Sequence, residues 1–221
     1  MGFFDYSWSI RDRIIEDFKT TLYMLFLSAI FAGIFGLIIG IIMVVTDHNR
    51  ILENKVIYSI LDKLTNIFRS IPFVILVALI APITKEIVKT RIGPNAAIVS
   101  LVFSCVPFFA RQVEQALASV EQGKIEAAEA MGASPFEIIT RVYLREGLPS
   151  LLRAGSITLI SLLGLTAMAG LVGGGGIGDL AIAVGYQRYK DDVVIVSVVL
   201  ILIVVFLIQA IANHLIRKTS H

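Results

Sequence analysis

The chain has 221 residues, a formal net charge of +2 and a mean hydropathy of +0.85, and only 16% of its residues are charged. The small net charge gives no support for nucleic-acid binding, and a single cysteine, Cys105, cannot form an internal disulfide. A soluble domain of this size usually carries about 25% charged residues. Because charges are missing in long blocks, the composition indicates a protein of the lipid bilayer.

The first uncharged block predicts the first membrane span over residues 20–46. A helix needs roughly 20 apolar residues to cross a bilayer, and this block is long enough. It is also longer than the apolar core of a secretory signal, which has about 7–15 residues. We therefore expect the N-terminal segment to be retained as a span.

The second span is predicted over residues 66–84, and it is the least regular of the set. The preceding residues 51–68 mix charges with apolar side chains at helical spacing, which is typical of an amphipathic helix at a membrane surface. Pro72 and Pro82 are expected to break or bend the span. A broken helix is tolerated where it faces protein or a water-filled path, so this span is a candidate wall of such a path.

Three further spans are predicted over residues 92–111, 152–176 and 193–216. Between the third and fourth lies a polar segment (residues 121–148), which keeps helical apolar spacing but is too polar to cross a membrane. The chain shows no linker and no internal repeat, so we expect one membrane domain over residues 1–221.

Five spans place the two termini on opposite sides of the membrane. With the polar segment inside, eleven Lys and Arg residues fall on the cytoplasmic side and eight on the outer side. Positive residues are enriched in cytoplasmic loops. This bias favours an external N-terminus and a cytoplasmic C-terminus.

The polar segment has the signals of two short helices that meet at a turn. Alanine-rich residues 124–131 favour a helix, and Gly132 stands where the residue after a helix needs a positive φ. Ser134 is a good N-cap, Pro135 suits the first helical position, and Glu137 completes a capping box. The second helix is expected to run to about residue 146 and to offer one apolar stripe to a partner: Phe136, Ile139 and Tyr143.

The run Glu126-Ala-Ala, three residues, then Gly132 resembles the EAA loop of permease subunits of ABC importers. The family pattern has Leu-Pro near the end of this loop, whereas here Leu144 is followed by Arg145. Four further runs, which begin at Arg69, Ala167, Gly173 and Gly185, resemble those of the methionine importer permeases: Arg69-Ser-Ile-Pro-Phe, Ala167-Met-Ala-Gly, Gly173-Gly-Gly-Gly-Ile-Gly-Asp-Leu and Gly185-Tyr-Gln-Arg.

The resemblance implies an all-α integral membrane protein with the type I ABC importer permease fold, five spans and a cytoplasmic coupling helix. It implies a homodimer in the bacterial plasma membrane that carries an amino acid, methionine in its L or D form, by alternating access. A separate ABC ATPase would bind ATP and magnesium, so this chain would hold no cofactor and catalyse no reaction. An external substrate-binding protein would complete the importer.

The resemblance also assigns roles to residues of the polar segment. Glu126 would make a charged contact to the ATPase, Ala127 and Ala128 would allow close approach, and Gly132 would set the turn. The coupling surface would further include Ser134, Pro135 and Phe136.

Candidate residues of the transport path lie in the second and fourth spans: Pro72, Gly164 and Met168. Met168 stands among small residues, and the resemblance implies a gate position on the path, but Met168 could equally fill space in a core. Gly173, Gly175 and Gly178 have the spacing of a dinucleotide-binding loop, yet they follow a membrane helix rather than a strand. We expect them to form a turn that ends the fourth span.

Three other functions are compatible with a membrane protein of this length. The first is a permease of a related ABC importer for another small substrate. The second is a membrane-embedded enzyme, which would need an acid or base to activate a serine, but the predicted spans contain no Asp or Glu. The third is a stand-alone channel or carrier, which copurification of an ATPase would exclude.

Overall fold

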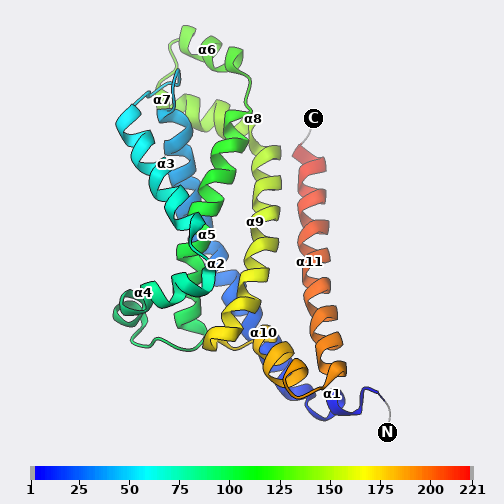
Figure 1. Ribbon diagram of the computed structural model, residues 1–221. Helices are drawn as coiled ribbons and strands as arrows, with labels where there is room; N and C mark the ends of the chain where they lie inside the picture. The colour runs from blue at the N-terminus through cyan, green and yellow to red at the C-terminus, as the bar shows by residue number, and fades with distance from the viewer. Residues whose placement is uncertain (1–2, 220–221) are drawn as a thin grey trace. The chain divides into compact units, whose positions relative to one another are not determined.

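A computed structural model describes residues 3–219, and within this range all regular secondary structure is helical. Figure 1 shows the elements in chain order. Their bounds are α1 (Asp5–Ser9), α2 (Arg11–Thr46), α3 (Lys55–Ser70), α4 (Phe73–Val88), α5 (Pro94–Ala118), α6 (Gln122–Ala130), α7 (Pro135–Glu137), η1 (Ile138–Tyr143), α8 (Leu144–Glu146), α9 (Leu148–Ala169), η2 (Gly170–Gly174), α10 (Ile177–Asp179), η3 (Leu180–Tyr186) and α11 (Asp191–Thr219).

Four helical stretches are long and apolar enough to cross a membrane: α2, α5, α9 with η2, and α11. The helices extend beyond the uncharged blocks at several ends, because charged residues in water continue a helix without difficulty. For example, α2 begins at Arg11 and α5 continues past Arg111 to Ala118. If the pair α3 and α4 counts as one bent span, the number rises to 5.

The irregular second span is divided into α3 and α4 by a bend of 113°. Pro72 is the N-cap of α4, with φ −56° and ψ 136°, so the break lies where the first of the two prolines predicts it. Pro82 does not break the span, since α4 continues through it to Val88. Pro82 lies in the third turn of α4.

The described chain forms two compact units. The first comprises residues 3–31, Ile71–Ser104 and Leu159–Gln209. One of its cores is made of apolar side chains from α2, α10, η3 and α11: Ile14, Ile177, Leu180, Val184 and Val193. The short apolar helix Ile177–Tyr186, which provides three of these, has no counterpart among the predicted elements.

The glycine-rich run in the first unit forms the predicted turn. Gly173, Gly175 and Gly176 have φ of 88°, 72° and 82°, which side-chain-bearing residues rarely adopt. After the turn, Gly178 packs so closely on α9 that an added Cβ would lie 2.1 Å from the carbonyl oxygen of Ala167. The glycines therefore let the chain reverse and pack against the helix that it has just left.

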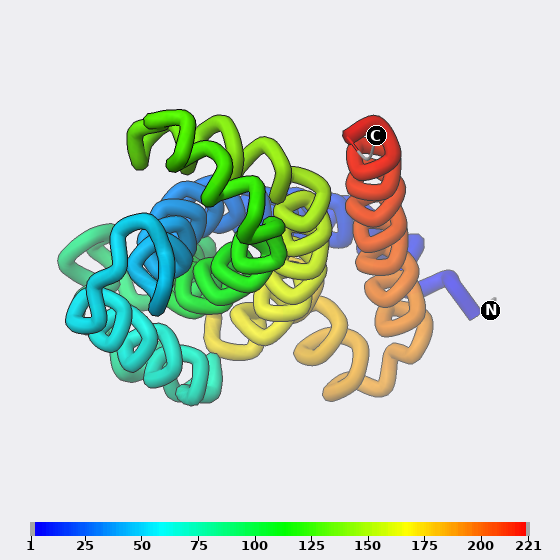
Figure 2. The backbone as a smooth tube through the Cα atoms, turned by 90° about the horizontal axis from the view of Figure 1, so that it is seen from above, coloured from blue at the N-terminus to red at the C-terminus, as the bar shows by residue number. Residues whose placement is uncertain are grey.

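The second unit comprises Ala32–Ser70, Cys105–Thr158 and residues 210–219. Within it, α3 lies beside the second halves of α2 and α5, as Figures 1 and 2 both show. Gly40 permits close packing of α2 on α5, because a Cβ there would lie 2.6 Å from the carbonyl oxygen of Ala110. The polar segment belongs entirely to this unit.

Candidate functional site

The turn at Gly132 has the hydrogen bonds of a Schellman motif. The Gly132 N–H donates to the Glu129 carbonyl at 2.9 Å, and the Ala133 N–H donates to the Ala128 carbonyl at 3.1 Å. Gly132 has φ 80°, as predicted. These bonds satisfy carbonyl groups at the end of α6 that would otherwise have no partner, so α6 ends sharply at this residue.

The next helix begins with the predicted capping box. The Glu137 N–H donates to the Ser134 hydroxyl at 3.4 Å, and the Ser134 N–H donates to the Glu137 carboxylate at 3.0 Å. Pro135 occupies the first turn. The bonds from the Ser134 backbone and hydroxyl to the carboxylate hold the pKa of Glu137 below its ordinary value. The two helices therefore meet at a turn with defined geometry on both sides.

The expected apolar stripe on the second helix is wrong. Phe136 is 74% exposed, whereas Tyr143 is fully buried. The reason is the π-helical stretch η1, which spans Ile138–Tyr143. A π-helix has more residues per turn than an α-helix, so residues seven apart no longer share one face. Tyr143 consequently turns inward while Phe136 stays outside.

A core under the polar segment fixes it to the second unit. Ile125 and Ala128 of α6 join Ile138 and Tyr143 of η1. The same cluster continues into the ends of two long helices through Val44, Val45, Val113 and Leu117, and it includes Val120 just after α5. Because these side chains are nearly all inaccessible to solvent, α6 and η1 form one packed body with the ends of α2 and α5.

Polar contacts reinforce this attachment at the surface. Lys124 Nζ donates to Glu146 Oε2 at 2.5 Å, which joins α6 to α8. That bond raises the pKa of Lys124 and lowers the pKa of Glu146. Arg50 donates from Nη1 to Gln122 Oε1 at 2.9 Å, which joins the loop after α2 to α6. Movement of α6 would therefore be transmitted to the elements that it contacts.

The exposed face of the polar segment carries both charge and apolar surface. Glu126 and Ala127 are exposed on α6, and Ser134, Pro135 and Phe136 are exposed after the turn. Met131, which sequence reasoning missed, is 82% exposed beside Gly132. Because Met131 directly precedes the turn glycine, its exposure could have been predicted from the sequence. Ala128 differs from the other candidates because it is 6% exposed and packs in the core of its own chain.

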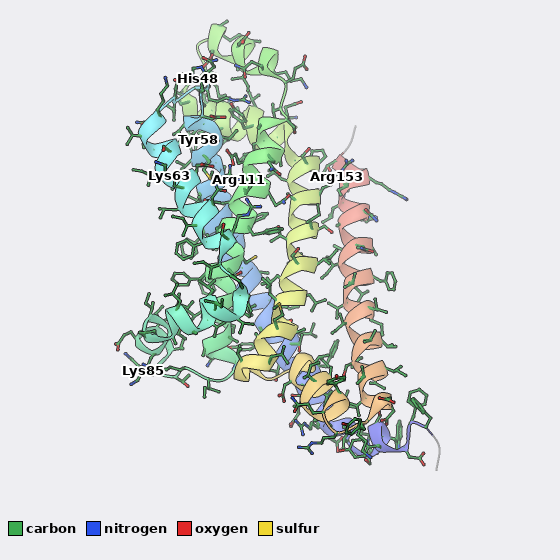
Figure 3. All side chains as sticks on the ribbon, viewed as in Figure 1. His48, Tyr58, Lys63, Lys85, Arg111 and Arg153 are labelled. Carbon is green, nitrogen blue, oxygen red and sulfur yellow. The ribbon has the colours of Figure 1, made fainter. Side chains whose placement is uncertain are left out.

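A buried charge cluster joins α3 to α5 in the second unit, and Figure 3 labels Tyr58 and Arg111 on these helices. Arg111 donates to Asp62 and, at 2.6 Å, to Glu114. The Tyr58 hydroxyl donates to the same Glu114 at 3.0 Å. The side chains of Arg111 and Glu114 are only 14% and 9% exposed. Neither acidic residue was singled out in the sequence, because only the packing of α3 on α5 pairs them.

Two of the three path candidates share one face of α9 in the first unit. Gly164 and Met168 are four residues apart, and both are exposed, Met168 by 40%. Ser161 and Leu171, at helical spacing, extend the same exposed face. Pro72 lies on another element, at the N-cap of α4. Nothing within 4 Å would meet a Cβ at Gly164, so this face of the chain is open there.

Comparison with known proteins identifies relatives over nearly the whole chain. A family model described as a binding-protein-dependent transport system inner membrane component matches residues 32–221. The probable D-methionine transport system permease protein MetI of Vibrio cholerae is 43% identical over 210 residues, which cover 95% of this chain and 93% of that protein. The methionine import system permease protein MetP of Bacillus subtilis is 46% identical over 172 residues, or 78% of each chain.

Solved structures give the same result for the fold. A chain of the MetNI methionine ABC transporter in an inward-facing conformation is 41% identical, with a TM-score of 0.94, and the match covers 96% of this chain and 99% of that one. A chain of an amino acid ABC transporter crystallised with histidines has a TM-score of 0.79 at 16% identity, which shows that the fold is shared.

Proposed function

The chain belongs to the family of inner membrane components of binding-protein-dependent transport systems, and we propose on this premise that it is the permease subunit of a methionine importer. Relatives named as methionine permeases match it at 43% and 46% identity. A chain of a methionine ABC transporter superimposes with a TM-score of 0.94. The permease forms the path across the membrane, and ATP hydrolysis belongs to a partner subunit.

The observation that carries this proposal is the rigid polar segment with its exposed outer face. Because α6 and η1 share a core with the ends of α2 and α5, a force applied to α6 would move these helices as a body. The exposed side chains of Glu126, Met131 and Phe136 offer a charged and apolar contact surface for an ATPase. ATP-driven closure of the ATPase would then switch the membrane path between its two open states.

We assign the path itself to the exposed face of α9. In a homodimer, two such faces with Gly164 and Met168 would bound a passage of small and flexible side chains. Such a passage makes few fixed charged contacts, which suits a zwitterionic amino acid that must bind weakly and leave again. An external binding protein would deliver the substrate, and the ATPase dimer would supply the energy.

The same proposal sets the orientation of the chain. An ATPase works in the cytoplasm, so the polar segment faces inward, and five crossings then place the N-terminus outside and the C-terminus inside. The bias of eleven against eight basic residues supports this orientation. Single-cysteine variants at Ser9 and Thr140, both exposed, on a Cys105→Ala background would report it through labelling with an impermeant thiol reagent. Labelling of the cysteine at position 9 from the cytoplasmic side alone would show that the N-terminus lies inside and would contradict the proposed orientation.

The decisive experiment is uptake into proteoliposomes that contain the permease, its ATPase and its binding protein. We expect L- or D-methionine to accumulate only when ATP and the binding protein are both supplied. Accumulation without the ATPase would indicate a channel or carrier instead. Accumulation of another small substrate in place of methionine would be consistent with an ABC importer but would contradict methionine as its substrate.

A further inference from the structure

The N-terminal helix α1 and the residue before it expose aromatic side chains at one end of the first unit. Phe4 is 53% exposed and Trp8 is 72% exposed. The guanidinium carbon of Arg11 lies 5.4 Å from the centre of the Trp8 ring. Tryptophan concentrates at membrane–water interfaces, because its ring is apolar while its N–H can remain in the polar layer. The composition of α1 therefore suits an interfacial position.

Buried hydrogen bonds fix α1 to the beginning of α11, beside which it lies in Figure 1. The backbone N–H and the hydroxyl of Ser7 both donate to Asp192 Oδ2 at 2.7 Å. Both residues are about 5% exposed. In addition, Lys190 Nζ lies 4.5 Å from the centre of the Tyr6 ring. Hydrogen bonds to a carboxylate are stronger than those between neutral groups, so α1 has a defined position.

This attachment sets the depth of α1 in the membrane. Asp191 and Asp192 are the last acidic residues before a stretch of α11 that has no Asp, Glu, Lys or Arg until Arg217. A charge inside the hydrocarbon is costly, so this pair marks the interface where α11 enters the bilayer. Since Ser7 binds Asp192, α1 lies at the same level.

A hollow of about 520 Å³ opens beside α1 at this level. Its lining comes from α1, α2, α11 and the residue before α1, and it is apolar at Phe4, Trp8, Ile14, Ile15 and Val196. Asp5 and Ser7 of α1 add polar groups to it. Arg11 also lines it, with a side chain that is 57% exposed. Arg11 makes a 3.8 Å ion pair with Asp12, whose side chain is 92% exposed. An apolar hollow with an accessible guanidinium matches an amphiphile whose head group carries a phosphate.

We propose that this hollow binds a membrane phospholipid, with an acyl chain against Ile15 and Val196 and the phosphate against Arg11. The bound lipid would hold α1 at the interface and thereby hold together the outer ends of α2 and α11. The site lies on the membrane face of the unit, so the proposal is independent of which substrate the importer carries.

Trp8 provides a direct test, because it is the only tryptophan of the chain. The complete importer is placed in nanodiscs, and the emission of a matched Trp8→Phe complex is subtracted. We expect phosphatidylcholine brominated on its acyl chains to quench Trp8 strongly, and aqueous iodide to quench it weakly. Strong quenching by iodide together with no quenching by brominated lipid would overturn the proposal.

Lipid retention gives the second test, with native mass spectrometry of the importer after detergent washing in phosphatidylglycerol. Arg11→Gln is expected to weaken retention about fivefold, the equivalent of about 1 kcal/mol for one basic residue near a membrane surface. Ile15→Ser should also reduce it, at little cost to folding because Ile15 is 50% exposed. The matched control is Arg188→Gln, an exposed arginine of the same unit outside the hollow, which should retain the lipid.

Two outcomes would contradict the lipid site. Equal retention by Arg11→Gln, Ile15→Ser and Arg188→Gln would show that no lipid occupies the hollow specifically. Shielding of Trp8 only after the binding protein is added, with no effect of brominated lipid, would show that a protein covers this surface instead.

Discussion

Gly132 is the residue at which backbone conformation is most demanding in the candidate coupling surface. Nothing lies within 4 Å of a Cβ built at this position, so a side chain would not clash, but the φ of 80° strains any other residue. The left-handed conformation costs an L-residue about 1–2 kcal/mol. Gly132→Leu should therefore distort the turn while membrane insertion is preserved, and uptake should be uncoupled from ATP hydrolysis.

Gly123→Leu is the matched control for this prediction. Gly123 lies in α6, has equally open surroundings and does not have a positive φ. The same side chain is thus introduced without backbone strain. Reconstituted uptake and substrate-stimulated ATPase activity should be normal in Gly123→Leu and lost in Gly132→Leu. Equal coupling of uptake to ATP hydrolysis in both variants would show that coupling does not depend on the conformation of this turn.

Met168 allows the α9 face to be tested as a path. It is 40% exposed, so its truncation creates no cavity in this chain, and folding should change by less than about 0.5 kcal/mol. If its side chain closes the path, Met168→Ala should increase the leak of methionine from loaded liposomes without ATP. Leu207→Ala, an exposed apolar residue of α11 outside this face, is the control. An unchanged leak in Met168→Ala would leave core filling against a neighbouring chain as its role.

At the scale of single elements, the capping box makes the start of α7 sensitive to pH. Hydrogen bonds from Ser134 hold the pKa of Glu137 below its ordinary value of 4.5, so the folded form favours the carboxylate. The stabilisation is therefore present above pH 4.5 and is lost as pH falls through the lowered pKa. Hydrogen exchange of residues 134–138, corrected for its intrinsic rate, should increase over this range. In Glu137→Ala, which has no side-chain acceptor, the exchange should be fast at every pH.

The attachment of α3 to α5 depends on the buried cluster around Arg111. Replacing Arg111 leaves Asp62 and Glu114 without their positive partner. Removing one partner of a buried ion pair lowers the free energy of unfolding by about 3–5 kcal/mol. Arg111→Met should thus lower the thermal unfolding temperature strongly, whereas Arg145→Met, at an exposed position, should not. The triple variant with Asp62→Asn and Glu114→Gln should recover part of the loss. Equal effects of Arg111→Met and Arg145→Met would show that the cluster contributes little.

At the scale of the whole molecule, assembly with the ATPase should depend on the exposed face of the polar segment. Phe136 is 74% exposed, so Phe136→Asp should leave the permease folded. A buried charge in an apolar contact is unfavourable, and truncation of central aromatic contacts often costs 2 kcal/mol or more. We expect the ATPase to copurify with Phe136→Asp at least about tenfold less than with Thr140→Asp, an exposed position on the same segment. Equal copurification would place the contact elsewhere.

The sequence by itself determined the features that depend on neighbours in the chain. Uncharged blocks predict spans because a bilayer excludes charge, and Gly132, Ser134 and Glu137 predict the turn and cap because these bonds join residues a few positions apart. The break at Pro72 follows for the same local reason. The resemblance of the Glu126–Gly132 run identified the family, which the comparisons confirm.

Tertiary structure decided the features that depend on distant packing. The π-helical turn moves Tyr143 inward, and Ala128 of α6 is buried, because both belong to the core that also contains Val113 and Leu117. The pairing of Arg111 with Asp62 joins residues 49 positions apart, and that of Ser7 with Asp192 joins residues 185 positions apart. Helical periodicity says which residues share a face, but only the packed fold determines what that face meets.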